Sequence, residues 1–235
     1  DAASEAASAF ERYNLVSAPV VDGDGRLIGR VTVNAVVDHI REKSAASQLA
    51  EAGLSQQEDV FAPVLDSFKN RWAWLAINLV TAFIASRVIG VFENSIVHLV
   101  ALAALMPIVA GIGGNSGNQT ITMIVRALAL GQIQPAYWRK LLGKELGVAL
   151  LNGVVWGVML GLIAYALYGN VALGGVMALA MLLNLVLAAL MGVAIPWLRW
   201  RFGRDPAVGS SVLITACTDS GGFFIFLGLA TVLLV

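Results

Sequence analysis

The stretch GIGGNSGNQT, residues 111–120, places four glycines, two asparagines, a serine, a glutamine and a threonine in a chain dominated by leucine, valine, alanine and isoleucine. Hydrophobic residues make up 58% of the 235 residues, and charged residues make up only 13%. This composition lies outside the range of soluble globular domains and predicts an integral membrane protein. The polar stretch therefore falls where lipid-facing residues would be expected.

The charged residues are divided sharply along the chain. Residues 1–70 hold eleven of the fifteen acidic residues, and residues 71–235 hold the other four. The first part predicts a small α/β module: a helix over about 1–13, strands over SAPVVD and LIGRVTV joined by the turn DGDG, and a helix from about Asn34. A polar, alanine-rich stretch up to about Val64 predicts a helix leading to the membrane. The formal net charge of +0 argues against a nucleic-acid partner.

Five apolar segments follow, over about 72–92, 96–130, 141–168, 172–198 and 208–235. A membrane span needs roughly 20 apolar residues, so four of the segments fit one span each. The second segment is longer and carries Pro107 and the glycine cluster, so it predicts a long, broken helix. Basic residues gather at alternate links between the segments, which predicts a cytoplasmic amino terminus and a carboxyl terminus outside.

Asp219 is the most informative single residue of the membrane part. It lies about 16 residues before the chain end, which is roughly 24 Å of helix, so we expect it inside the membrane on the cytoplasmic side of its middle. A carboxylate there costs roughly 2.5–3.5 kcal/mol and usually faces a protein interior or a water-filled path. A structural hydrogen bond to a neighbouring helix is the alternative to a cation site or a proton relay.

The polar neighbours of this carboxylate favour the cation site. Ser211, Thr215 and Asp219 are spaced i, i+4, i+8 and therefore share one helical face, which Gly222 continues. Hydroxyl, carboxylate and backbone oxygens are the ligands that hard cations prefer.

The opening stretch supplies a second polar face. Asn115, Gln119 and Thr122 fall at i, i+4, i+7, and Asn118 and Thr122 fall at i, i+4. Packing of small residues between helices would explain the glycines but not the amides. The two faces together predict a hydrophilic conduit across the membrane.

Three alternatives concern other functions. The sequence GNSG at 114–117 matches the Gly-x-Ser-Gly motif of rhomboid-type proteases, but such a protease needs a later histidine, and His39 and His98 both precede the serine. A proton-coupled carrier would also use an intramembrane carboxylate. A membrane-anchored sensor would make the α/β module the functional part. Glu145, beside Lys144, predicts a surface ion pair.

Three membrane stretches resemble the transmembrane domain of MgtE-type magnesium channels: MPIVAGIGGNSGNQTITMIVRALALG, WRKLLGKELGVALLNG and DPAVGSSVLITACTDSGGFFIFLGLA. The stretch YNLVSAPVVDGDGRLIGRVTVNAVVDHI resembles the end of that family's second CBS domain. The resemblance covers essentially all 235 residues. It divides the chain into a partial CBS domain (1–43), a connecting or plug helix (44–70) and a transmembrane domain (71–235).

The resemblance implies a mainly α, polytopic membrane protein with five transmembrane helices per subunit, preceded by a small α/β CBS remnant. It implies a homodimer in the inner (plasma) membrane with one Mg²⁺ pore between the subunits, lined by spans two and five and gated from the cytoplasmic side. Asp219 matches the pore aspartate that holds the ion. Asn118 and Thr122 match polar residues of the second-span pore wall. The helical faces described above add Asn115, Gln119, Ser211, Thr215 and Gly222 to the expected pore lining. A divalent cation/proton carrier of the same architecture is the alternative.

In that family, intracellular Mg²⁺ bridges acidic residues of the CBS domains and plug helix and closes the pore. Asp38 is the acid kept here, whereas other acids expected nearby are replaced by Asn14, Ala35, Lys43 and Ala46. Ala35 also removes the acid of a Thr-x-x-Asp ribose contact, which argues against ATP binding at this domain. We therefore expect weak or altered gating by cytoplasmic Mg²⁺.

Overall fold

The amino-terminal part of the chain is a small α/β unit. The structure, a computed structural model, describes residues 3–54, 60–129, 133 and 137–234. Helix α1 (Ala3–Tyr13) precedes strands β1 (Ser17–Val21) and β2 (Leu27–Thr32), which pair antiparallel, and helix α2 (Val33–Glu51) follows. The turn between the strands is held by Asp22, whose Oδ1 accepts hydrogen bonds from two backbone N–H groups at 2.8 and 3.0 Å. The hairpin expected at DGDG is confirmed.

Helix α2 joins this unit to the membrane part. The helix runs without interruption past residue 43, where the CBS remnant was expected to end, and stops at Glu51. It ends before the predicted stretch does, because Gly53 takes a φ of +78° and residues 60–63 are not helical. Residues 55–59 of the expected connecting helix lie outside the described residues.

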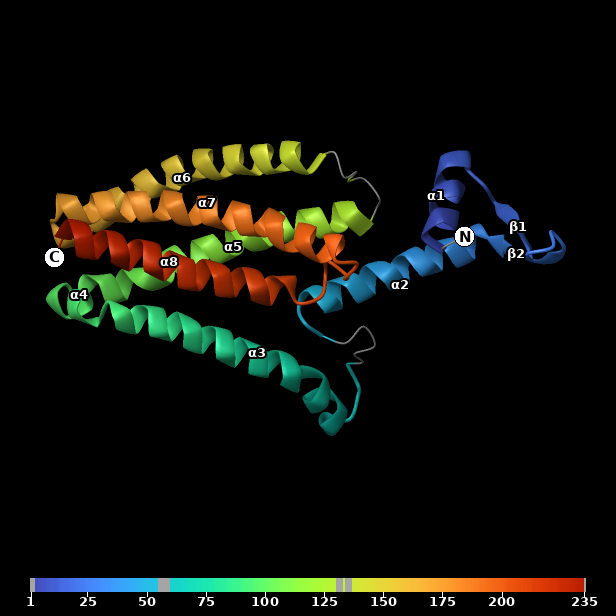
Figure 1. The fold of residues 1–235 in the computed structure, drawn as a ribbon, viewed down its shortest axis with the longest axis horizontal. Coiled ribbons are helices and arrows are strands. Elements are labelled where there is room, and N and C mark those ends of the chain that lie inside the picture. Colours follow the sequence, from blue (N-terminus) through green and yellow to red (C-terminus); the bar gives the residue numbers. More distant parts are fainter. Residues whose placement is uncertain (1–2, 55–59, 130–132, 134–136, 235) are drawn as a thin grey trace.

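Within the described residues, six helices form the membrane part, and α2 projects from one end of them (Figure 1). They are α3 (Val64–Val91), α4 (Glu93–His98), α5 (Ala101–Ala129), α6 (Trp138–Tyr168), α7 (Val171–Arg201) and α8 (Ser210–Leu234). Among the described residues, α3, α6, α7 and α8 are long and apolar enough to cross a membrane, and α5 is another long helix. Mainly helical architecture and a multi-pass membrane protein are therefore confirmed.

Helix α5 carries the glycine-rich stretch inside a continuous helix. The helix runs through Pro107 and through residues 111–120 without a break. The predicted long segment is instead divided at Leu99 and Val100, where the short helix α4 ends. A break at the glycines would leave backbone groups without partners at membrane depth, so the helix is kept and the glycines serve close packing instead.

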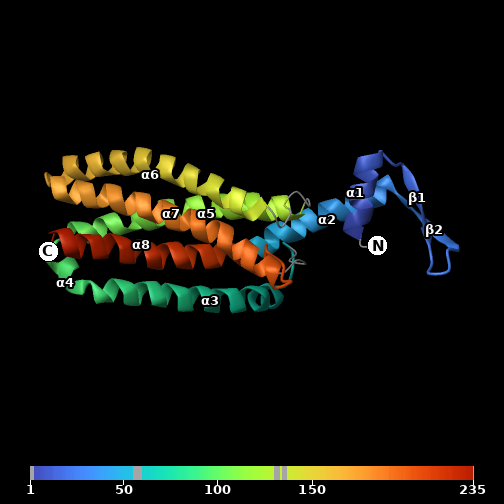
Figure 2. The same cartoon turned by 45° about the horizontal axis from the view of Figure 1, so that its top comes forward.

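Helix α7 is the centre of the bundle. It packs against α5, α6 and α8, and its buried side chains include Met177, Met181 and Leu185. Against α6 the backbones approach closely: a Cβ at Gly161 would lie 2.6 Å from the carbonyl oxygen of Gly174. Helices α3 and α6 lie at opposite edges of the bundle (Figure 2), and α3 is mostly exposed and packs mainly against α8.

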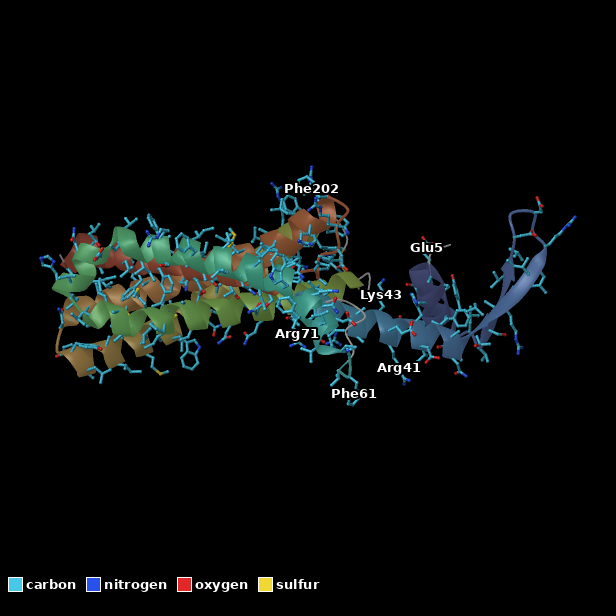
Figure 3. All side chains as sticks on the ribbon, turned by 90° about the horizontal axis from the view of Figure 1, so that it is seen from below. Glu5, Arg41, Lys43, Phe61, Arg71 and Phe202 are labelled. Atoms are coloured by element: carbon cyan, nitrogen blue, oxygen red, sulfur yellow. The ribbon has the colours of Figure 1, made fainter. Side chains whose placement is uncertain are left out.

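The end of α2 docks where α8 begins. The N–H of Gly209 donates a hydrogen bond to the carbonyl oxygen of Ala50 at 2.8 Å. The indole of Trp74, from α3, fills the space beside both Gly53 and Gly209, where a side chain would collide with it. Figure 3 labels Arg71 and Phe202 at this same end of the bundle. The amino-terminal unit is thus attached directly to the start of α8.

Candidate functional site

The candidate site is built from α5 and α8, which pack against each other. Two contacts set their register: Gly114 with Thr218, and Gly117 with Ile214. Residue numbers rise along α5 as they fall along α8, so the helices are antiparallel. At about 1.5 Å per residue, Asp219 therefore lies within one turn of Asn115 along the bundle axis, and Thr215 lies within one turn of Asn118.

The polar face of α8 is partly open. Thr215 is exposed, and its hydroxyl donates a hydrogen bond to the carbonyl oxygen of Ser211 at 2.9 Å, one turn earlier. Ser211 and Asp219 are partly buried. Within the described residues, the Asp219 carboxylate has no hydrogen-bond or ion-pair partner. Its oxygens are therefore available to a ligand from outside the chain.

The polar face of α5 is exposed on the single chain. Asn115, Gln119 and Thr122 are all exposed, as their i, i+4, i+7 spacing on one face would allow. Asn118 is partly buried, and its Oδ1 is covered without a hydrogen-bond partner among the described residues. The structure thus brings both predicted faces to the same depth, but one chain encloses neither of them.

Gly222 lies differently from the other candidates. It is buried, and a Cβ at this position would lie 2.8 Å from Nδ2 of Asn184 on α7. Gly222 is therefore covered by α7, whereas Thr215, two turns earlier on the same face of α8, is exposed. Asn184 is completely buried and was missed in the sequence. The signal that could have found it is a lone amide in the apolar run MLLNLVLAAL.

Glu145 is a buried acid of the bundle, and its predicted place at the surface is wrong. Its side chain is only 6% exposed. The hydroxyl of Thr120 on α5 donates a hydrogen bond to its Oε2 at 3.0 Å, and Lys144 Nζ lies 3.2 Å from its Oε1. Glu145 itself lies on α6, and a buried charge needs such partners. The ion pair with Lys144 is present, with only the lysine exposed.

Asp38 lies far from this site, on the exposed surface of α2. A neighbouring cavity of about 520 Å³ is lined by His39, Glu42 and Asp205, among others, but Asp38 does not line it. Among the described residues, no three His, Cys, Asp or Glu side chains come together as a metal site. Asp38 and Glu42, one turn apart on α2, fall short of such a group, so a regulatory ion at Asp38 would need further ligands.

Comparison with known families decides the class of protein. The MgtE family, described as divalent cation transporters, matches residues 106–229, and the CBS domain family matches residues 1–42. The chain belongs to the MgtE family. The first match includes every candidate residue of α5 and α8. MgtE proteins are transporters, so the chain is not an enzyme, and the rhomboid-type reading of GNSG is wrong.

Three MgtE relatives are similar to almost the whole chain. The chain is 34% identical over 239 residues to magnesium transporter MgtE of Thermus thermophilus, covering 98% of this chain and 51% of that protein. It is 30% identical over 229 residues to that of Bacillus subtilis, covering 97% and 50%, and 29% identical over 231 residues to that of Enterococcus faecalis, covering 98% and 51%. The chain spans about half the length of these curated relatives.

Proposed function

We propose that the chain forms a Mg²⁺ channel in the inner (plasma) membrane, with one pore between two copies lined by α5 and α8. The observation that carries this proposal is the exposed polar face of α5, with two amides and a hydroxyl. Moving one side-chain amide from water into hydrocarbon costs about 4–8 kcal/mol. A helix that exposes Asn115 and Gln119 is therefore unfavourable against lipid. A second copy that encloses a water-filled path with this helix would remove that unfavourable contact.

The choice of Mg²⁺ rests on the names of the relatives and on the chemistry of the faces. Mg²⁺ binds oxygen ligands and loses its water shell reluctantly. One Asp219 from each copy would supply the charge, while the exposed Thr215 and Gln119 would bind the ion's water molecules. The Asp219 carboxylate, without a partner inside the described chain, is suited to this role.

The proposed arrangement in the membrane has five spans, with α5 as the span that hydropathy alone does not select. The bases Arg71, Arg199, Arg201 and Arg204 gather at the end from which α2 projects, and positive loops favour the cytoplasm. The amino terminus would then be cytoplasmic and the carboxyl terminus outside. Cytoplasmic gating would act through the contact of α2 with the start of α8.

Regulation by cytoplasmic Mg²⁺ is expected to be weak. Asp38 lies on α2 one turn before Glu42, but Ala35 and Ala46 stand on this helix where acids were expected, and Lys43 brings a positive charge into it. A cation bound there would therefore have fewer oxygen ligands and a repelling neighbour. Single-channel recording during a titration of cytoplasmic Mg²⁺ measures this gating, and a steep closure would contradict the expectation.

The decisive test is Mg²⁺ uptake into proteoliposomes with and without an imposed pH gradient. We expect wild-type protein to take up Mg²⁺ independently of the gradient, and Asp219→Ala to lose this uptake. Asp66→Ala, which removes an exposed acid in the first turn of α3, serves as the matched control. Uptake that follows the proton gradient would favour the carrier instead. Uptake that survives in Asp219→Ala would remove Asp219 from the ion site.

A further inference from the structure

Asn184 of α7 contacts both proposed pore helices, α5 and α8. Its side chain is 0% exposed. Its Nδ2 donates a hydrogen bond to the carbonyl oxygen of Val109 on α5 at 2.8 Å. A Cβ at Gly113 on α5 would lie 2.9 Å from its Cγ, and a Cβ at Gly222 on α8 would lie 3.0 Å from the same atom. One amide therefore fills the space between two glycines on two helices.

The position of this amide matches the depth of the ion site. Gly222 follows Asp219 by three residues, and Gly113 precedes Asn115 by two, so each glycine lies about 3–5 Å from its polar neighbour along the helix axis. Any change in the space that Asn184 occupies must move α5 or α8 at that depth. Packed interiors transmit such changes because they contain few voids.

Stability alone does not explain an amide at this position. The side chain makes one interhelical hydrogen bond, and such bonds in membrane bundles contribute on average little. Its Oδ1 is buried without a partner among the described residues, and such burial is unfavourable. A leucine, which has the same branched shape, would avoid that penalty. The amide therefore calls for a role other than filling space.

We propose that Asn184 is a positioning residue that sets the spacing of α5 and α8 and thereby the cation selectivity of the pore at Asp219. The hydrogen bond to Val109 holds α5, and the contact with Gly222 holds α8 at a fixed distance. A shorter side chain at position 184 lets the two helices shift toward α7 and changes the width between the polar faces. This inference rests on the proposed Mg²⁺ channel.

The test compares uptake of Mg²⁺ and of Ca²⁺ by the full chain in proteoliposomes. Asn184→Ala is expected to keep Mg²⁺ uptake but to change the Mg²⁺/Ca²⁺ uptake ratio by about tenfold, as a shift in barrier of the size typical for core repacking implies. Asn184→Leu keeps the branched shape and removes the donor, so it tests the hydrogen bond while the space stays filled. Asn152→Ala is the matched control, because Asn152 is exposed and bonds only within α6.

A second experiment tests the packing directly by adding a methyl group on α5 and then removing the amide from α7. Gly113→Ala alone is expected to lower Mg²⁺ uptake by about tenfold or more, because its methyl group collides with the amide. Adding Asn184→Ala removes the amide and is expected to restore most of the uptake. Gly175→Ala on α7, where the added Cβ meets nothing within 4 Å, controls for replacing a glycine.

The outcomes separate this inference from the function on which it rests. A wild-type chain that takes up no Mg²⁺ would overturn the channel and this inference together. Wild-type uptake with an unchanged Mg²⁺/Ca²⁺ ratio in folded Asn184→Ala and Asn184→Leu would overturn the inference alone. If Gly113→Ala does not fold, as judged by gel filtration in detergent, the ratio in the Asn184 variants decides by itself.

Discussion

Replacing Thr120 with valine is expected to lower the stability of the bundle by removing one buried hydrogen bond. Thr120 is 6% exposed, and its hydroxyl donates to Glu145 Oε2 at 3.0 Å. Valine keeps the methyl group that packs against Gly192, where a Cβ would lie 2.9 Å from Thr120 Cγ2. The packing is therefore preserved, and the change isolates the hydrogen bond between α5 and α6.

The size of the effect follows from the charge and burial of Glu145. A hydrogen bond to a charged group contributes about 1.5–3 kcal/mol, and an unpaired buried acceptor carries a penalty of similar size. Lys144 still lies 3.2 Å from the other carboxylate oxygen, so the charge keeps one partner. For a chain of this length, the expected fall in melting temperature is roughly 3–12 °C.

The assay is thermal unfolding of the detergent-solubilised protein, followed by circular dichroism. Thr81→Val is the matched control, because Thr81 is on α3 and its hydroxyl donates to a carbonyl oxygen of its own helix. Glu145→Gln combined with Thr120→Val should recover part of the loss, since a neutral amide is less costly to leave unpaired. A melting temperature for Thr120→Val equal to that of the control would refute the reasoning.

Three further changes test other parts of the architecture. Gly161→Ala should lower the melting temperature by forcing α6 away from α7, whereas Gly147→Ala on the same helix, where the Cβ meets nothing within 4 Å, should not. Gly209→Ala should also lower it, because φ is +61° and Trp74 fills the space, and Gly203→Ala, with a φ of +67° in open space, should show the backbone cost alone. Gln119→Leu should leave the melting temperature unchanged or raise it and reduce Mg²⁺ uptake in proteoliposomes, because its amide is exposed.

Features that depend on local sequence could be predicted before the structure was known. The hairpin follows from a turn in which Asp22 accepts hydrogen bonds from the backbone of Asp24 and Arg26. The long apolar helices follow from the length that a bilayer demands. The two polar faces follow from helical spacing, which holds whatever packs around them. In each case the physical cause lies within a few residues of the feature.

Features that depend on a distant partner could not be predicted in this way. Glu145 is buried because α5 brings Thr120 to it, 25 residues away in the sequence. Asn184 bonds to Val109, 75 residues away, and meets glycines of two helices. The residue pattern within α6 or α7 does not predict these contacts with other helices. The break in the second segment was misplaced for a related reason, since tertiary packing keeps the glycines helical.

The burial of the helices and their polarity both indicate that the polar faces do not contact lipid. Helix α7 is the most apolar of the spans and the most buried, whereas α5 carries the amides and leaves them exposed. In a single bundle surrounded by lipid, the apolar α7 would be expected at the surface and the amides of α5 in the interior, because hydrocarbon accepts apolar surface and penalises amides. The apolar α7 is instead used as a rigid backing for α5 and α8, through Asn184 and the glycines that face it. Such an arrangement is favourable only if the polar faces meet water or another copy, and this supports the proposed pore.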